Sequence, residues 1–254
     1  MHRMKPVFKI GMLLASFPLF MGLVSPSWGD AENPGDYLHT RTYIGVVGTS
    51  VSVDKSGIFS GLNYSRVDNP YEVDLLPALS QNFGFGVLIG HREEAWALEA
   101  SFWQSNHNAT FGPGVVNSVS GASVTLTQQY QDTAVYNSVN IDFKRYFFTE
   151  TQTQPFINLG VSFPWIVVQN AASDANGNMG PLTLAGLGLN LGVGMEYYLS
   201  PDLSFFGAAY QRWASFDEFR GVGIQFNQIA QYGYSNSDAG SGLNFAVGTS
   251  VGLE

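Results

Sequence analysis

The chain has 254 residues, and only 12% of them are charged, about half the share of an average soluble domain. With 20 acidic residues against 11 Lys and Arg, its net charge of −9 argues against nucleic acid as a partner, because phosphate binding needs clustered basic side chains. The absence of Cys excludes a disulfide framework and thiolate metal sites. Past residue 29, no apolar run is long enough for a membrane-spanning helix.

The first 29 residues have the three parts of a secretory signal: a basic start, an apolar run at 10–24, and small residues before a cleavage point ahead of Asp30. An uncleaved anchor helix is the alternative, but the run is short for a span and Pro18 interrupts it. We therefore predict a signal peptide at 1–29, followed by a polar N-terminal periplasmic segment at 30–40.

The stretch 185–199 shows the pattern on which the fold prediction depends. One side, at a period of two, carries the apolar residues Leu187, Leu189, Leu191 and Val193. The other side carries four glycines, Asn190 and Glu196. Successive side chains of a strand point to opposite faces, so the second face is almost free of side chains. A soluble sandwich needs bulk on its inner face, whereas this pattern is typical of a narrow barrel whose apolar face contacts lipid.

Seven further stretches repeat this alternation, which gives predicted strands at 41–51, 82–91, 95–104, 134–146, 155–168, 185–199, 202–213 and 242–254. The last strand is clear, and it is predicted to turn toward lipid the side chains of Leu243, Phe245 and Val247. Both faces of the first strand are apolar. The seventh has aromatic residues at both parities, Phe205 on one and Phe206 and Tyr210 on the other, and a β-bulge would reconcile them.

The links between these strands alternate in length. Those after the second, fourth and sixth strands are short, and the other four are predicted external loops at about 52–81, 105–133, 169–184 and 214–241. Short periplasmic turns opposite long external loops are the rule in outer-membrane barrels, but long structureless loops are unusual in a compact soluble domain. We therefore predict an all-β fold over 41–254, an eight-stranded antiparallel up-and-down transmembrane β-barrel.

Aromatic residues gather near the predicted strand ends. At the inner ends they are Tyr43, Trp96, Tyr146, Phe147, Phe148, Tyr197 and Tyr198, and at the outer ends Phe83, Phe102, Trp103, Trp165 and Trp213. Amphipathic rings favour the two lipid–water interfaces, so we interpret these residues as two girdles. The alternative is that strand ends are commonly aromatic in any protein.

Four stretches carry a family resemblance: NSVNIDFKRYF (137–147), QPFINLGVSF (154–163), LGVGMEYYLSPDLSFF (191–206) and GLNFAVGTSVGL (242–253). They resemble the small outer-membrane β-barrel family that includes the membrane domain of outer-membrane protein A and the opacity-type porin-family proteins. The resemblance extends over 41–254 and rests on pattern. It implies the barrel fold and a place in the bacterial cell outer membrane, and it specifies fold far better than function.

The inward parity collects a predicted polar network of Glu99, Asn140, Asp142, Lys144, Asn158, Asn190 and Glu196, with Arg212 as a further candidate. Buried charges must be paired or solvated, so the first interpretation is an internal plug. The alternative is a narrow ion path that this network gates. Glycine-rich inward faces at 84–90 and 186–194 favour the ion path, because they leave space for water.

Outer-membrane lipid A acyl-modifying enzymes share this architecture and use His with Ser or Asp. Behind the leader the histidines are His39, His91 and His107, and only His107 lies near the predicted outer rim. No acidic residue is close to it in sequence, so we interpret it as a solvated loop histidine. The stretch 174–178 resembles part of a calcium loop but lacks the distal Glu, and a turn is the better interpretation. We predict no catalytic, cofactor-binding or metal site.

These patterns predict a non-enzymatic integral outer-membrane protein with a structural or adhesin-like role in its external loops. A small porin-like channel or carrier is the main alternative, and a lipid A-modifying enzyme is a third. The expected partners are outer-membrane lipid and lipopolysaccharide, the barrel assembly machinery and periplasmic chaperones during biogenesis, and unidentified ligands of the loops. Neither a cofactor nor nucleic acid is expected.

Overall fold

The computed structural model describes residues 40–53, 63–64, 73–75, 78–111, 114–117, 123–126, 130–173, 179–221, 224–226 and 241–253. The predicted signal peptide, residues 30–39 of the predicted periplasmic segment and the turn at 174–178 lie outside these ranges. No helix in the described part of the chain is long and apolar enough to cross a membrane.

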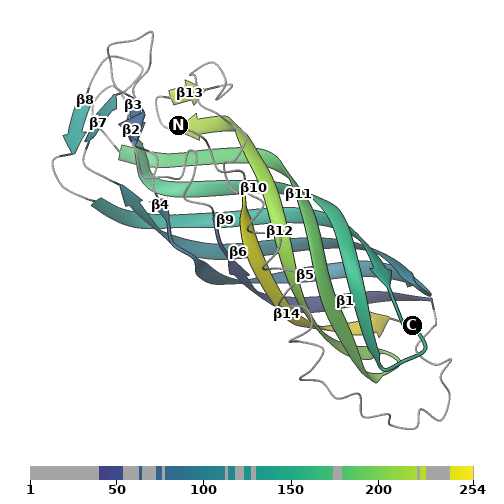
Figure 1. Ribbon diagram of the computed structural model, residues 1–254. Coiled ribbons are helices and arrows are strands. Elements are labelled where there is room, and N and C mark those ends of the chain that lie inside the picture. Colours follow the sequence, from purple (N-terminus) through teal and green to yellow (C-terminus); the bar gives the residue numbers. More distant parts are fainter. Residues whose placement is uncertain are drawn as a thin grey trace, which may run out of the picture. The chain divides into compact units, whose positions relative to one another are not determined.

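Eight long strands form the fold: β1 (Arg41–Val51), β5 (Asn82–Glu93), β6 (Trp96–Phe111), β9 (Tyr130–Tyr146), β10 (Thr153–Ser173), β11 (Met179–Ser200), β12 (Leu203–Gly221) and β14 (Gly242–Leu253). Each is antiparallel to its neighbours in chain order, and the first and last, β1 and β14, pair with each other (Figure 1). This last pairing closes the sheet. The predicted eight-stranded antiparallel barrel is confirmed.

Six short strands accompany the barrel: β2 (Asn63–Tyr64), β3 (Val73–Leu75), β4 (Ala78–Leu79), β7 (Gly114–Asn117), β8 (Ser123–Leu126) and β13 (Ile224–Phe226). β2 pairs with β3 and β7 with β8, while β4 and β13 extend the main sheet beside β6 and β12. The segments that join β5 to β6, β9 to β10 and β11 to β12 are short, and up-and-down pairing places all three at one end, called here the short-turn end.

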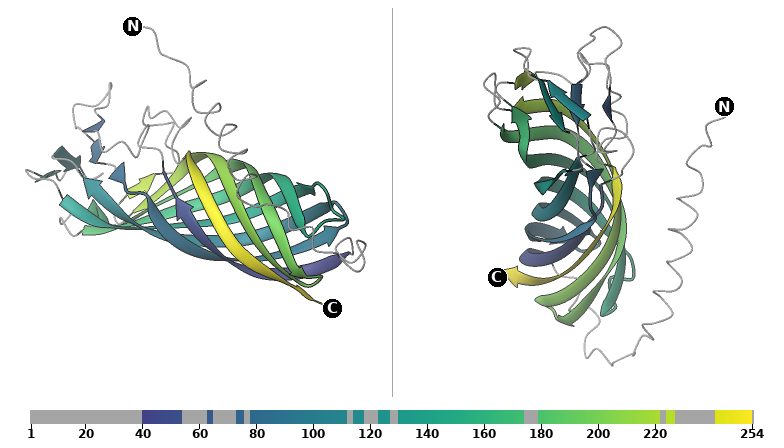
Figure 2. Two further views of the ribbon diagram at one scale, coloured as in Figure 1. Left: turned by 60° about the horizontal axis from the view of Figure 1, so that its bottom comes forward. Right: turned by 90° about the vertical axis from the view of Figure 1, so that its left-hand side faces the viewer.

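The stagger of the strands fixes the width of the barrel. Ladder partners can be followed from strand to strand around the barrel, starting at Arg212 on β12. The path returns to β12 at Asp202, which lies opposite Gly252 of β14. Asp202 and Arg212 are ten residues apart, and this offset is the stagger of the barrel. With ordinary strand spacings, this stagger over eight strands tilts them by about 40° from the axis. The strands accordingly cross the axis obliquely (Figure 2). A barrel of this size has an interior just wide enough for side chains to fill.

The outer face of the barrel is apolar around the short-turn half of its height. Large apolar side chains that are 42–66% exposed include Ile89, Leu98, Phe143, Leu159, Leu191, Phe205 and Val247. Five of the seven predicted lipid-facing residues are in this exposed set, namely Leu187, Leu189, Leu191, Phe245 and Val247, and the other two, Val193 and Leu243, are half-buried. We call this zone the apolar belt. At the end of the barrel opposite the short-turn end, its boundary lies near Trp165 and Trp213.

Beyond the apolar belt, the inside and the outside exchange polarity. Outward positions there are exposed polar residues such as Asn106, Asn108 and Thr133. Inward positions are fully buried apolar residues, among them Val51, Leu79, Ile166, Val168, Leu184 and Phe216. This outer part therefore follows the rule of a water-soluble barrel, with a hydrophobic core and a solvated wall.

This exchange explains why the strands are longer than predicted. β6 continues to Phe111, β9 begins at Tyr130, and β10, β11 and β12 extend into the segments predicted as loops at 169–184 and 214–241. The predicted loops at 105–133, 169–184 and 214–241 are therefore shorter than the sequence indicates. The predicted strands have apolar residues outside and small residues inside, and this pattern reverses where the apolar belt ends.

The seventh long strand needs no bulge at its aromatic pairs. Its ladder to β14 is continuous from Leu203 to Arg212, so the bulge hypothesis is wrong for this stretch. Phe205 is half exposed and faces outward, while Phe206 and Tyr210 are buried in the lumen. The register shifts of β12 lie in its other ladder, the one to β11, opposite Ala185–Gly186 and Tyr198–Ser200.

Exposure on the outer wall agrees with the girdle interpretation for some aromatic residues and contradicts it for others. Trp96, Phe147, Phe148, Phe83 and Trp213 are exposed. The residues that point into the barrel instead, each at most 6% exposed, are Tyr43, Tyr146, Tyr198 and Trp103. The three tyrosines lie near strand ends, as predicted, whereas Trp103 lies in the middle of β6; all four are at the inward parity, where they pack against other luminal side chains.

Inward glycines accommodate this luminal packing. A Cβ built on Gly248 would lie 2.6 Å from the ring of Phe206, and one on Gly86 would lie 2.7 Å from Trp103. The rings of Tyr43, Phe156 and Tyr210 similarly occupy the space over other inward glycines. The expectation that these glycines leave room for water is therefore wrong: large side chains from neighbouring strands fill that room.

Substitution of two glycines tests this packing. We expect Gly248→Ala to lower the free energy of unfolding by about 1–3 kcal/mol, because the added methyl group overpacks the lumen. Gly48→Ala should leave stability unchanged or raise it slightly, because the nearest atom to its Cβ lies 3.8 Å away on the outer face. Urea unfolding of both variants in lipid vesicles measures the difference, and equal effects would contradict the filled lumen.

Candidate functional site

The candidate functional site is the network of charged and polar side chains in the lumen. At its centre, Lys144 Nζ lies 2.6 Å from Glu99 Oε2, and both side chains are at most 5% exposed. Tyr43 donates a hydrogen bond of 3.1 Å to the same carboxylate oxygen. These three residues come from β9, β6 and β1, so the contact ties three strands together across the lumen.

A second cluster lies at the short-turn end and centres on Glu196. Arg41 donates to Glu196 at 3.2 Å and to the Tyr198 hydroxyl at 2.7 Å. Arg92 also donates to the Tyr198 hydroxyl, and its other amino group donates to Gln154 at 2.6 Å. The guanidinium carbon of Arg92 lies 4.0 Å from the ring centre of Tyr146, a cation–π contact. Two arginines and one carboxylate thus close this end with hydrogen bonds and rings.

Amide side chains connect the middle of the lumen. Asn158 donates to Asp142 at 3.1 Å, and Asn190 donates to Asn140 at 3.4 Å. Asn140 in turn donates to Ser101 at 3.2 Å. Such bonds satisfy polar groups that are costly to bury alone.

All seven residues predicted for the interior network are at most 5% exposed, and all contribute to it from the inward face. The candidate Arg212 is also buried, with its guanidinium 4.5 Å from the ring centre of Tyr136. The charged partners Arg41 and Arg92 were not predicted. Extending the alternation of the second strand by one residue past His91 would have placed Arg92 inward. Arg41 begins a strand whose two faces are both apolar, so the pattern gave no signal for it.

His107 is not a solvated loop residue, so the interpretation drawn from the sequence is wrong. It lies on β6 beyond the apolar belt and is 1% exposed. Its Nδ1 lies 2.6 Å from the Ser80 carbonyl oxygen, and its Nε2 lies 2.8 Å from the Ser105 hydroxyl. In the neutral ring, Nδ1–H therefore donates to Ser80 and Nε2 accepts from Ser105. This histidine fixes the chain before β5 against β6, beside the pairing of β4.

Metal ligation has no candidate in this part of the molecule. Within the described ranges, no group of three or more His, Cys, Asp or Glu side chains converges on one point. The carboxylates of the lumen instead contact Lys144, Arg41 and amide groups.

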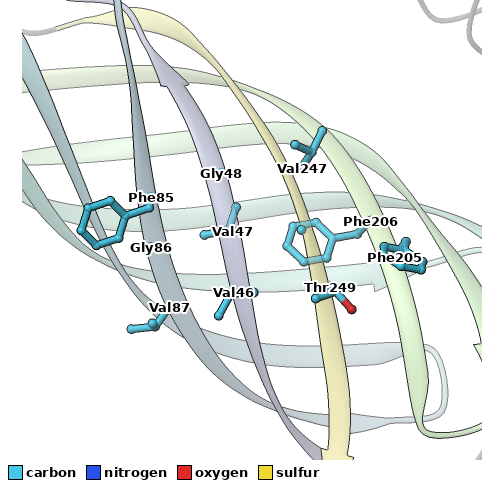
Figure 3. A pocket seen from close by; sticks show the side chains of 11 residues that line it. Val46, Val47, Gly48, Phe85, Gly86, Val87, Phe205, Phe206, Val247 and Thr249 are labelled. Carbon is cyan, nitrogen blue, oxygen red and sulfur yellow. The ribbon is translucent and has the colours of Figure 1, made fainter.

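A shallow depression of about 750 Å³ lies on the barrel wall. Its lining includes Val46 and Gly48 of β1, Phe85 and Val87 of β5, Phe205 of β12 and Val247 of β14 (Figure 3). Gly48 leaves the depression open between the two phenylalanines. The depression is continuous with the apolar belt and has no charged residue in its lining.

Together these contacts give a barrel with its ion pairs inside and its large apolar side chains outside. In the short-turn half of the barrel, polar residues lie inside and apolar residues outside, the reverse of a water-soluble protein. Comparison with known proteins finds no matching family model and no matching curated protein. Among solved structures, the chain is similar to Neisserial surface protein A, with 11% identity and a TM-score of 0.47 over 85% of this chain and 99% of that one.

Two other solved structures have a similar chain course. The outer membrane protein OprG from Pseudomonas aeruginosa has 12% identity and a TM-score of 0.47, covering 85% of this chain and 96% of that one. Ail, the attachment invasion locus protein of Yersinia pestis, has 12% identity and a TM-score of 0.40, covering 84% and 97%. All three are small outer-membrane β-barrel proteins. The barrel assignment itself rests on the strand ladders of this chain.

Proposed function

We propose that this protein is an integral protein of a bacterial outer membrane, with a structural or surface-binding role that its external loops perform. The observation that carries the proposal is the polarity of the wall: side chains such as Leu191 and Val247 are about half exposed or more, while Lys144 and Glu99 are buried. In water this arrangement would expose a continuous apolar surface far larger than monomeric soluble proteins tolerate. In lipid the same wall places hydrocarbon against hydrocarbon, and closure of the sheet lets the strands pair their backbone groups with one another.

The packing of the lumen supports a loop-based role over transport. Aromatic rings from Tyr43, Phe156, Phe206 and Tyr210 lie over the inward glycines, and two ion pairs, Lys144 with Glu99 and Arg41 with Glu196, lie among them. A solute would have to displace these groups. The long links, by contrast, leave the barrel from the end where the strands extend past the apolar belt, which suits contact with other molecules.

The proposal includes no enzymatic activity. Ser105 and His107 are within hydrogen-bond distance, but both are about 1% exposed, and the second nitrogen of the ring is held by a backbone carbonyl. These contacts give His107 a structural role between β6 and the segment before β5. Unchanged lipid A mass spectra on expression are the corresponding expectation.

Two measurements test the proposal. Refolding into detergent or vesicles should give a β-type circular dichroism spectrum and a gel mobility that changes on heating, because a closed barrel resists unfolding by detergent alone. In planar bilayers, the wild type and Glu196→Ala should give no conductance steps. A protein that stays folded and monomeric without detergent would contradict the membrane location, and regular steps would favour the channel alternative.

A further inference from the structure

The outer face of the short-turn end carries a single described arginine, Arg145, whereas Arg41, Arg92, Lys144 and Arg212 are buried. Lys144 and Arg145 are consecutive on β9, so their side chains point to opposite faces. Lys144 points inward and pairs with Glu99. Arg145 is half-buried on the outer wall, and none of the ion pairs between described residues involves it.

Arg145 is held by aromatic rings. Its guanidinium carbon lies 4.1 Å from the ring centre of Trp96, which is its ladder partner on β6. Trp96 in turn stacks on Phe143 at a centroid distance of 4.8 Å, and both rings are exposed by more than 40%. A guanidinium stacked on a ring keeps the N–H donors at its edge available, and these donors match two oxygens of a phosphate.

The position of Arg145 along the barrel axis determines which part of a lipid it can contact. It is the second-last residue of β9, next to the short turn at 147–152. An arginine on a lipid face costs about 2–4 kcal/mol at the midplane and close to nothing near the interface. Trp96 marks the same interface, where amphipathic rings concentrate. Arg145 therefore lies where the apolar belt meets the headgroup layer.

We propose that Arg145, seated on Trp96, binds the phosphate of a phospholipid headgroup at the short-turn rim. This inference rests on the proposed function, because it needs the apolar belt to lie in a membrane. The short-turn end faces the periplasm in that arrangement, so the adjoining leaflet is the phospholipid one. The acyl chains of the same lipid would lie along the belt beside Phe143 and Ile157, which are both 46% exposed.

The test is native mass spectrometry of the refolded protein in a phosphate-free, non-ionic detergent, titrated with phosphatidylethanolamine. Wild type should retain one lipid at concentrations where Arg145→Ala needs at least tenfold more, and Arg145→Lys should fall between them because it keeps charge without the planar fork. His91→Ala is the matched control: His91 is outward at the same rim, with Glu93 as its nearest charge, and its loss should change nothing.

Two further ligands identify the source of the recognition. Diacylglycerol with the same acyl chains should bind wild type and Arg145→Ala equally weakly, because it lacks the phosphate. Inorganic phosphate alone should not bind to the protein or displace the lipid at millimolar concentration, because contacts of the acyl chains with the apolar belt supply part of the affinity. Equal phosphatidylethanolamine retention by wild type and Arg145→Ala, or saturation by inorganic phosphate alone, would overturn the inference. Neither result would contradict the proposed membrane location, because that proposal is tested separately by the heat-dependent gel mobility of the same samples.

Discussion

Replacing Lys144 by methionine is expected to lower the free energy of unfolding by about 3–5 kcal/mol, because it leaves the carboxylate of Glu99 buried without its cation. The two groups are 2.6 Å apart and almost wholly shielded from water. Tyr43 still donates to Glu99 in the variant, but one neutral hydrogen bond replaces little of a buried ion pair. Equilibrium urea unfolding in lipid vesicles, followed by tryptophan fluorescence, measures the loss.

The double variant Lys144→Met with Glu99→Gln is the control for this result. Because it removes both charges and keeps similar volumes, it should recover most of the stability, as replacement of whole buried ion pairs often does. A double-mutant cycle then gives the coupling between the two positions. If the single and double variants lose the same free energy, Lys144 and Glu99 do not act as a pair, and the lumen contains enough water to solvate each alone.

The second large effect is expected on the outer face. Leu191→Arg should lower the free energy of unfolding in vesicles by about 2–4 kcal/mol, the cost of an arginine at the midplane of a transmembrane barrel. Leu191 is 48% exposed and lies near the middle of the outward apolar run of β11. On the surface of a water-soluble protein, the same change would be almost neutral.

Asn106→Arg provides the matched control. Asn106 is exposed and points outward like Leu191, but it lies on β6 beyond the apolar belt. An arginine there should change the free energy of unfolding by no more than about 0.5 kcal/mol, because its charge stays in water. If Leu191→Arg proves as mild as Asn106→Arg, the apolar belt does not contact hydrocarbon, and the proposed location is wrong.

The barrel could be predicted because an apolar outer face and a glycine-rich inner face give a simple alternation. In the stretch 185–199, the outward residues from Leu187 to Met195 are bulky and apolar and most inward ones are glycine, so the period of two is visible without a structure. The same alternation placed Glu99, Lys144 and Glu196 on the inward side. What it could not give was their partners, because the pairing of Lys144 with Glu99 depends on the register between β6 and β9.

The luminal aromatic residues could not be assigned for a different reason. A narrow barrel needs bulk inside wherever its wall is glycine, so Phe206 fills the space over Gly248 and Tyr210 lies over Gly192. In sequence, such a ring is indistinguishable from one that faces lipid. The same ambiguity affected Tyr43 and Tyr198, which end strands as girdle residues do but point inward.

Strand length was underestimated where the surroundings change. On β12 the run Ala214, Ser215, Phe216 still alternates, but its apolar members are now the inward ones. On β6 the residues after Gln104 are Ser, Asn, His and Asn, which show no apolar period at all. A search tuned to one polarity stops at this boundary, although the backbone ladder between β6 and β9 continues to Phe111 and Tyr130.

Because the polarity reverses along the wall, the length of the barrel beyond the apolar belt and the composition of the belt depend on different parts of each strand. Two residues could be added to each strand of a hairpin, at a point beyond Trp165 and Trp213 on the side of the long links. The hairpin would then be longer by one inward and one outward residue per strand, and every luminal ion pair would stay in place. The length of the barrel beyond the apolar belt can therefore change in steps of two residues, while the apolar belt and the luminal ion pairs stay the same.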